Sequence, residues 1–277
     1  MISFLLTQTI VCVIIFLGDN MNINKIIKLK NNKYKILIDD EFITTYDNVI
    51  LENELLYKKK LDKELYNKIK KDTEYYDIYD KVVKHILKKR RSEKEVKCYI
   101  EKYTTNKNYV ENIINKLKNI NLINDLEYCK SFINDRVYLS KNGINKIKND
   151  LLNQDIPLEI IEQELKNIDI NIINQRLEKI IIKKINSNKK YSFNQLKQKI
   201  LNELIILGYD KKMILEVIDN NTKDDNDIIK KEYNKLYNKL KTKYEGYELC
   251  SKIKQKLLIK GFTNEEINLL INEKKEV

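Results

Sequence analysis

The sequence predicts a mostly α protein: tandem three-helix repeats in an elongated, curved array, with a small β-rich (α+β) unit at the N-terminus. Three observations support this prediction. Apolar residues recur with helical spacing from about residue 77 to the C-terminus. The whole pattern returns at intervals of about 50 residues. The 277-residue chain has only one proline and five glycines, so few residues interrupt its helices.

Residues 1–20 are interpreted as an apolar leader or as an upstream extension that is not native. The apolar run at residues 2–17 is shorter than the roughly 20 residues that a membrane-spanning helix needs. No basic segment precedes it and no small-residue cleavage site follows it. A signal anchor, a signal peptide and a true translation start at Met21 remain open. The start at Met21 is favoured, because the ordered pattern begins after it.

Residues 21–72 are predicted to form a small β-meander followed by helices. Apolar and polar residues alternate around Ile27 and Ile36, and Asn31-Asn32 and Asp39-Asp40 supply turns. From residue 47 the spacing becomes helical, with one short helix at residues 49–56 and another carrying Leu61 and the apolar positions after it. This unit is too small to bury a large core alone.

Four three-helix repeats are predicted at residues 73–124, 125–169, 170–222 and 223–277. Two apolar positions four residues apart recur in the second helix of each repeat, and two more recur in the third. In the second helix they are Val96 and Ile100, Ile147 and Leu151, Leu196 and Ile200, and Ile253 and Leu257. In the third they are Ile113 and Leu117, Ile161 and Leu165, Ile214 and Ile218, and Ile267 and Ile271. A single repeat cannot cover this stripe, so neighbours are expected to stack.

Capping signals fall in the same register. Ser92 with Glu95 predicts a capping box, in which each side chain bonds the backbone N–H of the other residue. Ser192 with Gln195 and Thr263 with Glu266 repeat this spacing. Gly208 and Gly261 are expected to close the helices before them, and Pro157 marks a helix start.

The charge balance suggests an acidic or polyanionic partner. The formal net charge is +12, although a solvated lysine-rich surface explains the same number. The cysteines Cys12, Cys98, Cys129 and Cys250 form no C-x-x-C pair, so neither a zinc site nor a disulfide framework is indicated. The only histidine, His85, lies on a predicted helix, where a surface or core role is expected. No nucleotide, metal or hydrolase motif is found.

Several stretches resemble the RecX family of bacterial regulatory proteins. Residues 82–87, RRSEKEV at 90–96, residues 113–117, LIND at 122–125 and Tyr128 resemble the family's first repeat. FINDR at 132–136, SKNGI at 140–144 and residues 147–152 are similar to the start of its second repeat. The resemblance extends from Met21 to the C-terminus. The family often has a basic residue at the place of Asn134, and Arg or Pro at the places of Ile144 and Asn145. The nearby Lys141, Lys146 and Lys148 are expected to compensate for the missing charge.

The resemblance implies a regulator of RecA in homologous recombination, DNA repair and the SOS response. Such proteins bind RecA, settle in the groove of the RecA–ssDNA filament and mostly inhibit its growth, ATP hydrolysis and strand exchange. The implied protein is not an enzyme and needs no cofactor or metal. It is expected to be a cytoplasmic monomer with weak direct DNA binding and no membrane contact.

The densest basic clusters are the candidate contacts to RecA or DNA. They lie at predicted helix ends and turns, where cations reach phosphates or carboxylates without leaving water. Arginines among them also make bidentate bonds. The alternative for each is a solvated face, or for Arg136 an ion pair with a neighbouring carboxylate. The candidates are Lys88, Lys89, Arg90, Arg91, Arg136, Lys141, Lys146, Lys148, Lys183, Lys184, Lys189 and Lys190.

Two other functions remain open at the level of the sequence. One is a stand-alone basic helical protein that binds nucleic acid without RecA, with a steep salt dependence. The other is a membrane-tethered structural protein held by residues 2–17. The eighteen tyrosines are expected mainly to fill cores, although tyrosine also stacks on bases.

Overall fold

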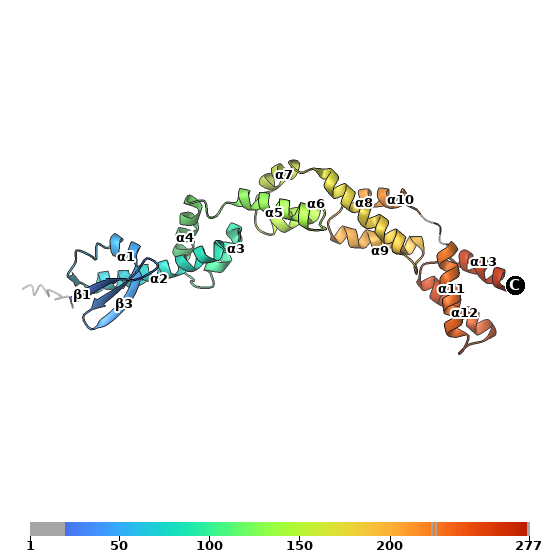
Figure 1. The fold of residues 1–277 in the computed structure, drawn as a ribbon, viewed down its shortest axis with the longest axis horizontal. Helices are drawn as coiled ribbons and strands as arrows, with labels where there is room; N and C mark the ends of the chain where they lie inside the picture. Colours follow the sequence, from blue (N-terminus) through green and yellow to red (C-terminus); the bar gives the residue numbers. More distant parts are fainter. Residues whose placement is uncertain (1–19, 223, 225, 276–277) are drawn as a thin grey trace, which may run out of the picture. The chain divides into compact units, whose positions relative to one another are not determined.

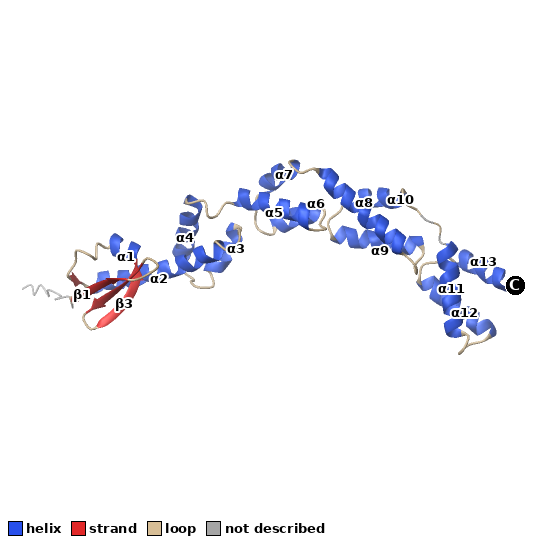
Figure 2. Cartoon of the chain, viewed as in Figure 1, coloured by secondary structure: helices blue, strands red, loops and turns tan. Residues whose placement is uncertain are grey.

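The predicted fold class is confirmed by a computed structural model, which describes residues 20–222, 224 and 226–275. These residues contain thirteen α-helices and one four-stranded sheet at the N-terminal end (Figures 1 and 2). They form two compact units, the first with residues up to 91 and 95–123, the second with residues 92–94 and 124 onward. The apolar run at residues 2–17 and Cys12 lie outside the described residues.

The predicted meander forms three of the four strands of the sheet. Strands β1 (Met21–Lys28), β2 (Lys33–Ile38) and β3 (Glu41–Tyr46) pair in antiparallel fashion. Asn31, Asn32 and Asp39 have φ values of 59°, 56° and 49°, which suits the tight turns predicted there. Asp39 also accepts the backbone N–H of Asn22 at 2.9 Å, so this acidic residue supports a turn.

The sheet has a fourth strand that the sequence pattern does not reveal. Strand β4 (Lys60–Leu61) pairs with the start of β1 and gives the order β3-β2-β1-β4. The prediction that Leu61 is helical is therefore wrong. Asp62 caps helix α2 (Lys63–Ile86) by accepting the N–H of Leu65 at 2.7 Å, so the helix begins only after the strand.

Helix α2 supplies two hydrophobic cores. Its N-terminal part, with Ile69 and Tyr76, packs with the sheet and with α1 (Asp47–Glu52). Its second half, with Ile78 and Val82, packs with α3 (Glu93–Ile100) and α4 (Lys107–Asn119). The division expected between residues 72 and 73 thus falls inside one continuous helix. No glycine, proline or cap interrupts the chain at that point.

Two buried phenols join α2 to the sheet and to α1. The Tyr46 hydroxyl donates to Asp77 at 2.6 Å, and the Tyr76 hydroxyl donates to Glu52 at 2.5 Å. Burial, followed by these hydrogen bonds to carboxylates, raises the pKa of Tyr46 and of Tyr76 well above the usual value near 10. Both residues therefore stay neutral in the folded state at pH values where the unfolded chain ionises.

These shifts predict a loss of stability at alkaline pH. Since the folded pKa values are raised, their contribution to stability is complete below about pH 10 and declines as the pH rises further. Thermal unfolding between pH 8 and pH 11 should show a falling melting temperature for the first unit, which hydrogen exchange of β3 and α2 identifies. A Tyr46→Phe, Tyr76→Phe double variant should be less stable at pH 8 but lose less stability on going to pH 11. Parallel pH curves for the variant and the wild type would contradict this.

The remaining helices follow the predicted repeat. The second repeat contains α5 (Asp125–Leu139), α6 (Ile144–Leu152) and α7 (Leu158–Lys166). The third contains α8 (Ile170–Ser187), α9 (Phe193–Ile206) and α10 (Lys211–Asp219). The fourth contains α11 (Asn226–Leu240), α12 (Gly246–Ile259) and α13 (Asn264–Lys275). The recurring apolar positions are buried in every repeat, apart from Leu165 and Ile271, which are half-buried.

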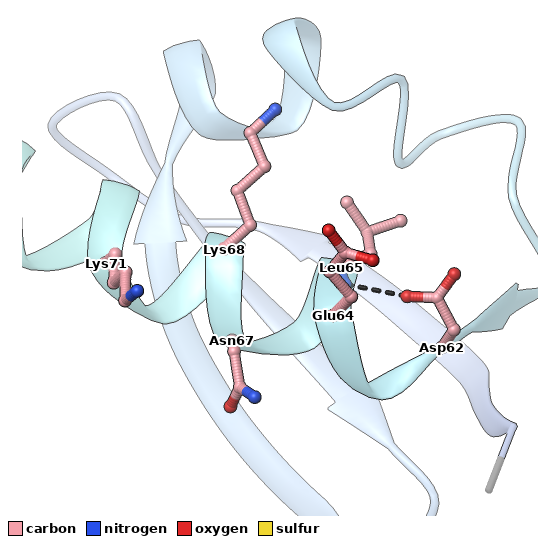
Figure 3. Close-up of a pocket in the computed structure, with 6 residues that line it drawn as sticks. All are labelled: Asp62, Glu64, Leu65, Asn67, Lys68 and Lys71. Atoms are coloured by element: carbon pink, nitrogen blue, oxygen red, sulfur yellow. Dashed lines mark hydrogen bonds between the residues drawn. The ribbon is translucent and has the colours of Figure 1, made fainter. Parts of the chain in front are cut away.

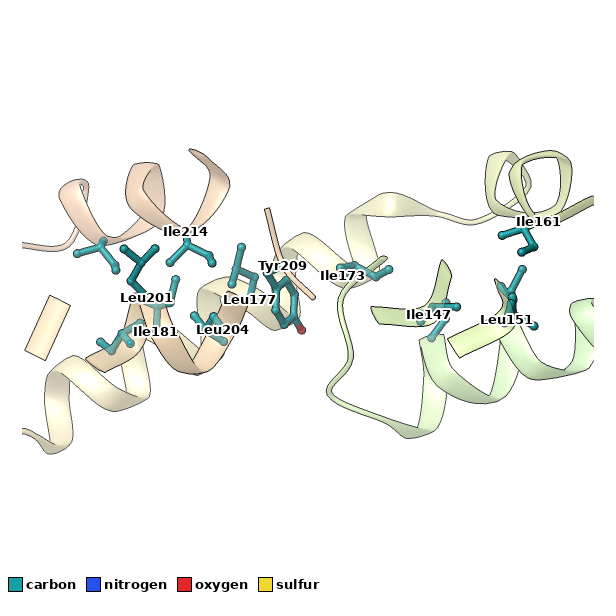
Figure 4. Packing of buried hydrophobic residues seen from close by; sticks show 14 of the residues in the cluster. Ile147, Leu151, Ile161, Ile173, Leu177, Ile181, Leu201, Leu204, Tyr209 and Ile214 are labelled. Atoms are coloured by element: carbon teal, nitrogen blue, oxygen red, sulfur yellow. The ribbon is translucent and has the colours of Figure 1, made fainter. Parts of the chain in front are cut away.

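Repeats two and three share one hydrophobic core. The cluster runs from α5 to α10 without a break. Figure 4 shows Ile173 and Tyr209 between the side chains around Ile147 and those around Leu204. The fourth repeat has a separate cluster around Ile253 and Phe262. Stacking therefore merges two repeats into one folded body, as expected for units that cannot bury their apolar faces alone.

The predicted caps form at several helix ends. The Thr263 N–H donates to Glu266 Oε2 at 2.7 Å, and the Glu266 N–H donates to Thr263 Oγ1 at 3.2 Å, which is a complete capping box. Ser192 accepts the N–H of Gln195 at 3.3 Å. Gly208 and Gly261 close α9 and α12 with φ values of 86° and 87°, a region that favours glycine.

Candidate interaction surface

The middle helices of the second and third repeats meet end to end. The N–H of Gly143, before α6, donates to the carbonyl of Leu207, after α9, at 2.7 Å. The Asn145 N–H donates to the Gly208 carbonyl at 3.1 Å. Each bond joins a free N–H at one helix start to a free carbonyl at the other helix end. The opposite ends of the two helix dipoles also attract each other.

The same junction recurs between the third and fourth repeats. The Ser192 N–H, before α9, donates to the Lys260 carbonyl at 3.0 Å, and the Gln195 side chain donates to the Ile259 carbonyl at 2.9 Å. The Gln195 side chain thus bonds the next repeat. The predicted capping box instead had this side chain accept the backbone N–H of Ser192.

Residues 92–94, which belong to the second unit, make related contacts with the end of α6. The buried Ser92 hydroxyl donates to Gln154 Oε1 at 3.0 Å. Lys94 Nζ lies 2.9 Å from the Asn153 carbonyl oxygen and 3.0 Å from Asp155 Oδ1. Ser92, which was predicted to cap the start of a helix, therefore also bonds a residue that follows α6. The segments before α3, α6 and α9 are thus held in place by the end of another middle helix.

A cation stands two residues before the N-cap position of the middle helix in every repeat. The four residues are Arg90, Lys141, Lys190 and Lys243, and all are exposed. A cation near a helix N-terminus does not favour the helix itself, because the dipole is positive there. Three of them belong to the predicted basic clusters. Lys243 was missed, because it stands outside a dense cluster and only the register of the repeat identifies it.

Other predicted contacts form ion pairs within their own repeats. Lys146 lies 3.1 Å from Asp150, Lys148 lies 2.8 Å from Glu162, and Lys184 lies 2.6 Å from Glu203. The Lys148 ammonium lowers the pKa of Glu162 through a hydrogen bond and its charge. Lys146 pairs within α6, whereas Lys148 joins α6 to α7 and Lys184 joins α8 to α9. Their partners are 14 and 19 residues away in the last two pairs, so sequence spacing alone does not identify them.

The predicted arginines differ in their surroundings. Arg91 Nη1 lies 3.7 Å from Glu95 Oε1, and Lys89 Nζ lies 4.0 Å from the same atom. Arg136 places its guanidinium 4.8 Å from the centre of the Phe132 ring, a cation–π contact. Lys88, Lys183 and Lys189 are exposed on the surface.

Arg176 is an arginine whose role the sequence did not indicate. From α8 it donates to the carbonyls of Val137 and Asn142, the latter at 3.4 Å. It thereby satisfies the carbonyl end of α5. Its local sequence looks like any polar helix face, and only the packing of α8 beside α5 gives it this structural task.

A pocket beside the start of α2 is lined by Asp62, Glu64, Leu65, Asn67, Lys68 and Lys71 (Figure 3). In this view Lys68 and Asn67 point to opposite sides of the helix and do not converge on one point. Among the residues with a described placement, no cluster of histidine, cysteine and acidic side chains could hold a metal ion. Within residues 20–222 and 226–275, no helix has the length and apolar character to cross a bilayer.

Several known proteins that are similar to this chain carry the name regulatory protein RecX. Regulatory protein RecX of Streptococcus pneumoniae (strain CGSP14) is 30% identical over 257 residues, which cover 90% of this chain and 99% of the relative. Regulatory protein RecX of Streptococcus mutans serotype c is 29% identical over 259 residues, with 91% and 99% covered. Regulatory protein RecX of Streptococcus agalactiae serotype III is 33% identical over 194 residues, with 68% and 74% covered.

A solved structure supports the fold. The crystal structure of a regulatory protein RecX covers 72% of this chain and 99% of its own, with a TM-score of 0.63 and 19% sequence identity. A comparison with protein-family models finds no match for this chain.

Proposed function

Because the chain belongs to the RecX family of regulatory proteins, we propose that it binds RecA and the RecA–ssDNA filament and mostly inhibits filament growth, ATP hydrolysis and recombination. It acts by binding, without catalysis or a cofactor of its own. It works as a cytoplasmic monomer in homologous recombination and DNA repair.

The observation that carries this proposal is the cation that recurs in each repeat. Arg90, Lys141, Lys190 and Lys243 have the same place before their middle helices. A protein filament repeats its surface, so a ligand with one cation per repeat can meet the same acidic group or phosphate on successive subunits. Bonds of this kind add up, because once one repeat is bound the next binds from a high local concentration.

The direct test is co-sedimentation of the full chain with RecA filaments assembled on single-stranded DNA, together with the rate of filament ATP hydrolysis. We expect the protein to pellet with the filament and to lower the ATPase rate as its concentration rises. RecA without DNA and DNA without RecA serve as controls. A protein that stays in the supernatant and leaves the ATPase rate unchanged would rule out this function.

A further inference from the structure

Three aromatic side chains form a surface group in the first unit, which we call the aromatic platform: His85, Tyr99 and Tyr103. His85 on α2 stacks on Tyr99 of α3, with ring centroids 3.7 Å apart and an interplanar angle of 2°. Tyr103 meets Tyr99 edge-on, with centroids 5.3 Å apart, and the two hydroxyls bond at 3.1 Å. The three rings are therefore held in fixed orientations.

The platform lies at the surface. Tyr103 is 41% exposed, and His85 and Tyr99 are half-buried. Tyr99 packs against the hydrophobic core between α2, α3 and α4. A flat ring stack that still faces water offers area for another planar group.

Cations surround the platform. Lys81 Nζ lies 4.8 Å from the centre of the Tyr103 ring, and Lys102 Nζ lies 5.7 Å from that of Tyr99. Burial lowers the pKa of His85, and the charges of Arg91, Lys88 and Lys102 lower it further, while Glu95 opposes them. The imidazole is thus uncharged near neutral pH, within a region of positive potential.

We propose that the aromatic platform binds single-stranded nucleic acid, with a base stacked on the platform and Lys81, Lys88 and Lys102 meeting the phosphates. Base stacking on aromatic side chains beside a basic surface is the usual physics of single-strand binding. A duplex keeps its base faces covered by neighbouring bases, so it cannot use the rings. An acidic peptide can use the cations but gains less from the stack. This binding is separate from the proposed action on RecA and needs no RecA.

His85 provides a specific probe, because it is the only histidine in the chain. Its ring proton resonances can be followed by NMR without assignment. Addition of an oligo-dT strand of about 12 nucleotides should move them upfield through the ring current of a stacked base. The phosphates should also raise the pKa of His85, since they offset the surrounding cations. Inorganic polyphosphate should reproduce the pKa change without the upfield shift.

Variants test the same contact by fluorescence anisotropy with labelled oligo-dT. His85→Ala and Tyr103→Leu should each weaken binding about tenfold. Tyr57→Leu is the matched control, since Tyr57 is 88% exposed in the same unit and lies outside the platform. A circular dichroism melt checks that each variant folds. RecA co-sedimentation of the same variants shows whether the two functions separate.

Four results would overturn the proposal. Oligo-dT binding by His85→Ala and Tyr103→Leu within about twofold of wild type would exclude the stack. Equal affinity for a duplex of the same length would exclude single-strand recognition. An upfield shift with polyphosphate would attribute the signal to charge alone. Polyglutamate that competes as well as oligo-dT would assign the surface to an acidic peptide.

Discussion

Gly208→Ala should lower the free energy of unfolding of the second unit by about 3 to 5 kcal/mol. A Cβ at Gly208 would lie 2.2 Å from the backbone nitrogen of Lys146, and Gly208 has a φ of 86°. The added methyl group therefore meets rigid backbone and also strains its own residue. Relief of the clash requires α6 and α9 to separate, which breaks the hydrogen bonds of Gly143 and Asn145 across the junction.

Gly246→Ala is the matched control for Gly208→Ala. Gly246 has a φ of 53°, but no atom lies within 4 Å of its would-be Cβ. It should cost only about 1 kcal/mol, from backbone strain alone. Gly143→Ala tests the steric clash without backbone strain. Its Cβ would lie 2.5 Å from the Gly208 carbonyl carbon, but its φ of −84° suits alanine.

Urea denaturation followed by circular dichroism, with hydrogen exchange of α6 and α9, measures these costs. The exchange data are needed because a chain of two units need not unfold in one step. Similar costs for Gly208→Ala and Gly246→Ala would show that the close approach of the two helices contributes nothing to stability.

Reversal of the recurring cations should weaken filament binding at least tenfold, since each lost cation also becomes a repulsive charge. The variant combines Arg90→Glu, Lys141→Glu, Lys190→Glu and Lys243→Glu. Its affinity for the RecA–ssDNA filament should also depend less steeply on salt, because fewer cations take part in binding. Co-sedimentation over a range of salt concentrations measures both effects.

The control for this variant carries the same net charge and places the substitutions elsewhere. It combines four exposed lysines on the second or third helices: Lys97→Glu, Lys166→Glu, Lys211→Glu and Lys256→Glu. If both variants lose the same affinity, the filament senses only net charge. If the recurring cations merely complement the carbonyl ends at the junctions, their reversal should lower the melting temperature and leave binding unchanged.

Part of the candidate site follows from the sequence. Arg90, Lys141 and Lys190 lie in basic clusters before predicted helix starts, and the structure exposes all three. The density of basic residues nevertheless identified the recurring cations only in part. It omitted Lys243, and it included Lys148 and Lys184, whose charges meet Glu162 and Glu203 across helix pairs. An ion pair between two helices depends on how the helices pack, and the local sequence around each lysine does not show this.

The aromatic platform also depends partly on the sequence and partly on the tertiary structure. The sequence placed the only histidine on a helix and gave it a surface or core role. Stacking of His85 on Tyr99 depends on the angle between α2 and α3. The two residues are fourteen positions apart in the chain, and only the tertiary fold brings their rings together.

The sequence by itself determined the helical repeat, its register and most of the core. Burial of residues four apart on a helix is a local property, so the positions of Ile147 and Leu151 could be read from spacing. Only the tertiary structure decided how the repeats join. The bonds from Gly143 to Leu207 and from Ser192 to Lys260 link backbone groups that every sequence possesses. They form because the helices meet end to end, and that arrangement depends on contacts between residues far apart in the chain.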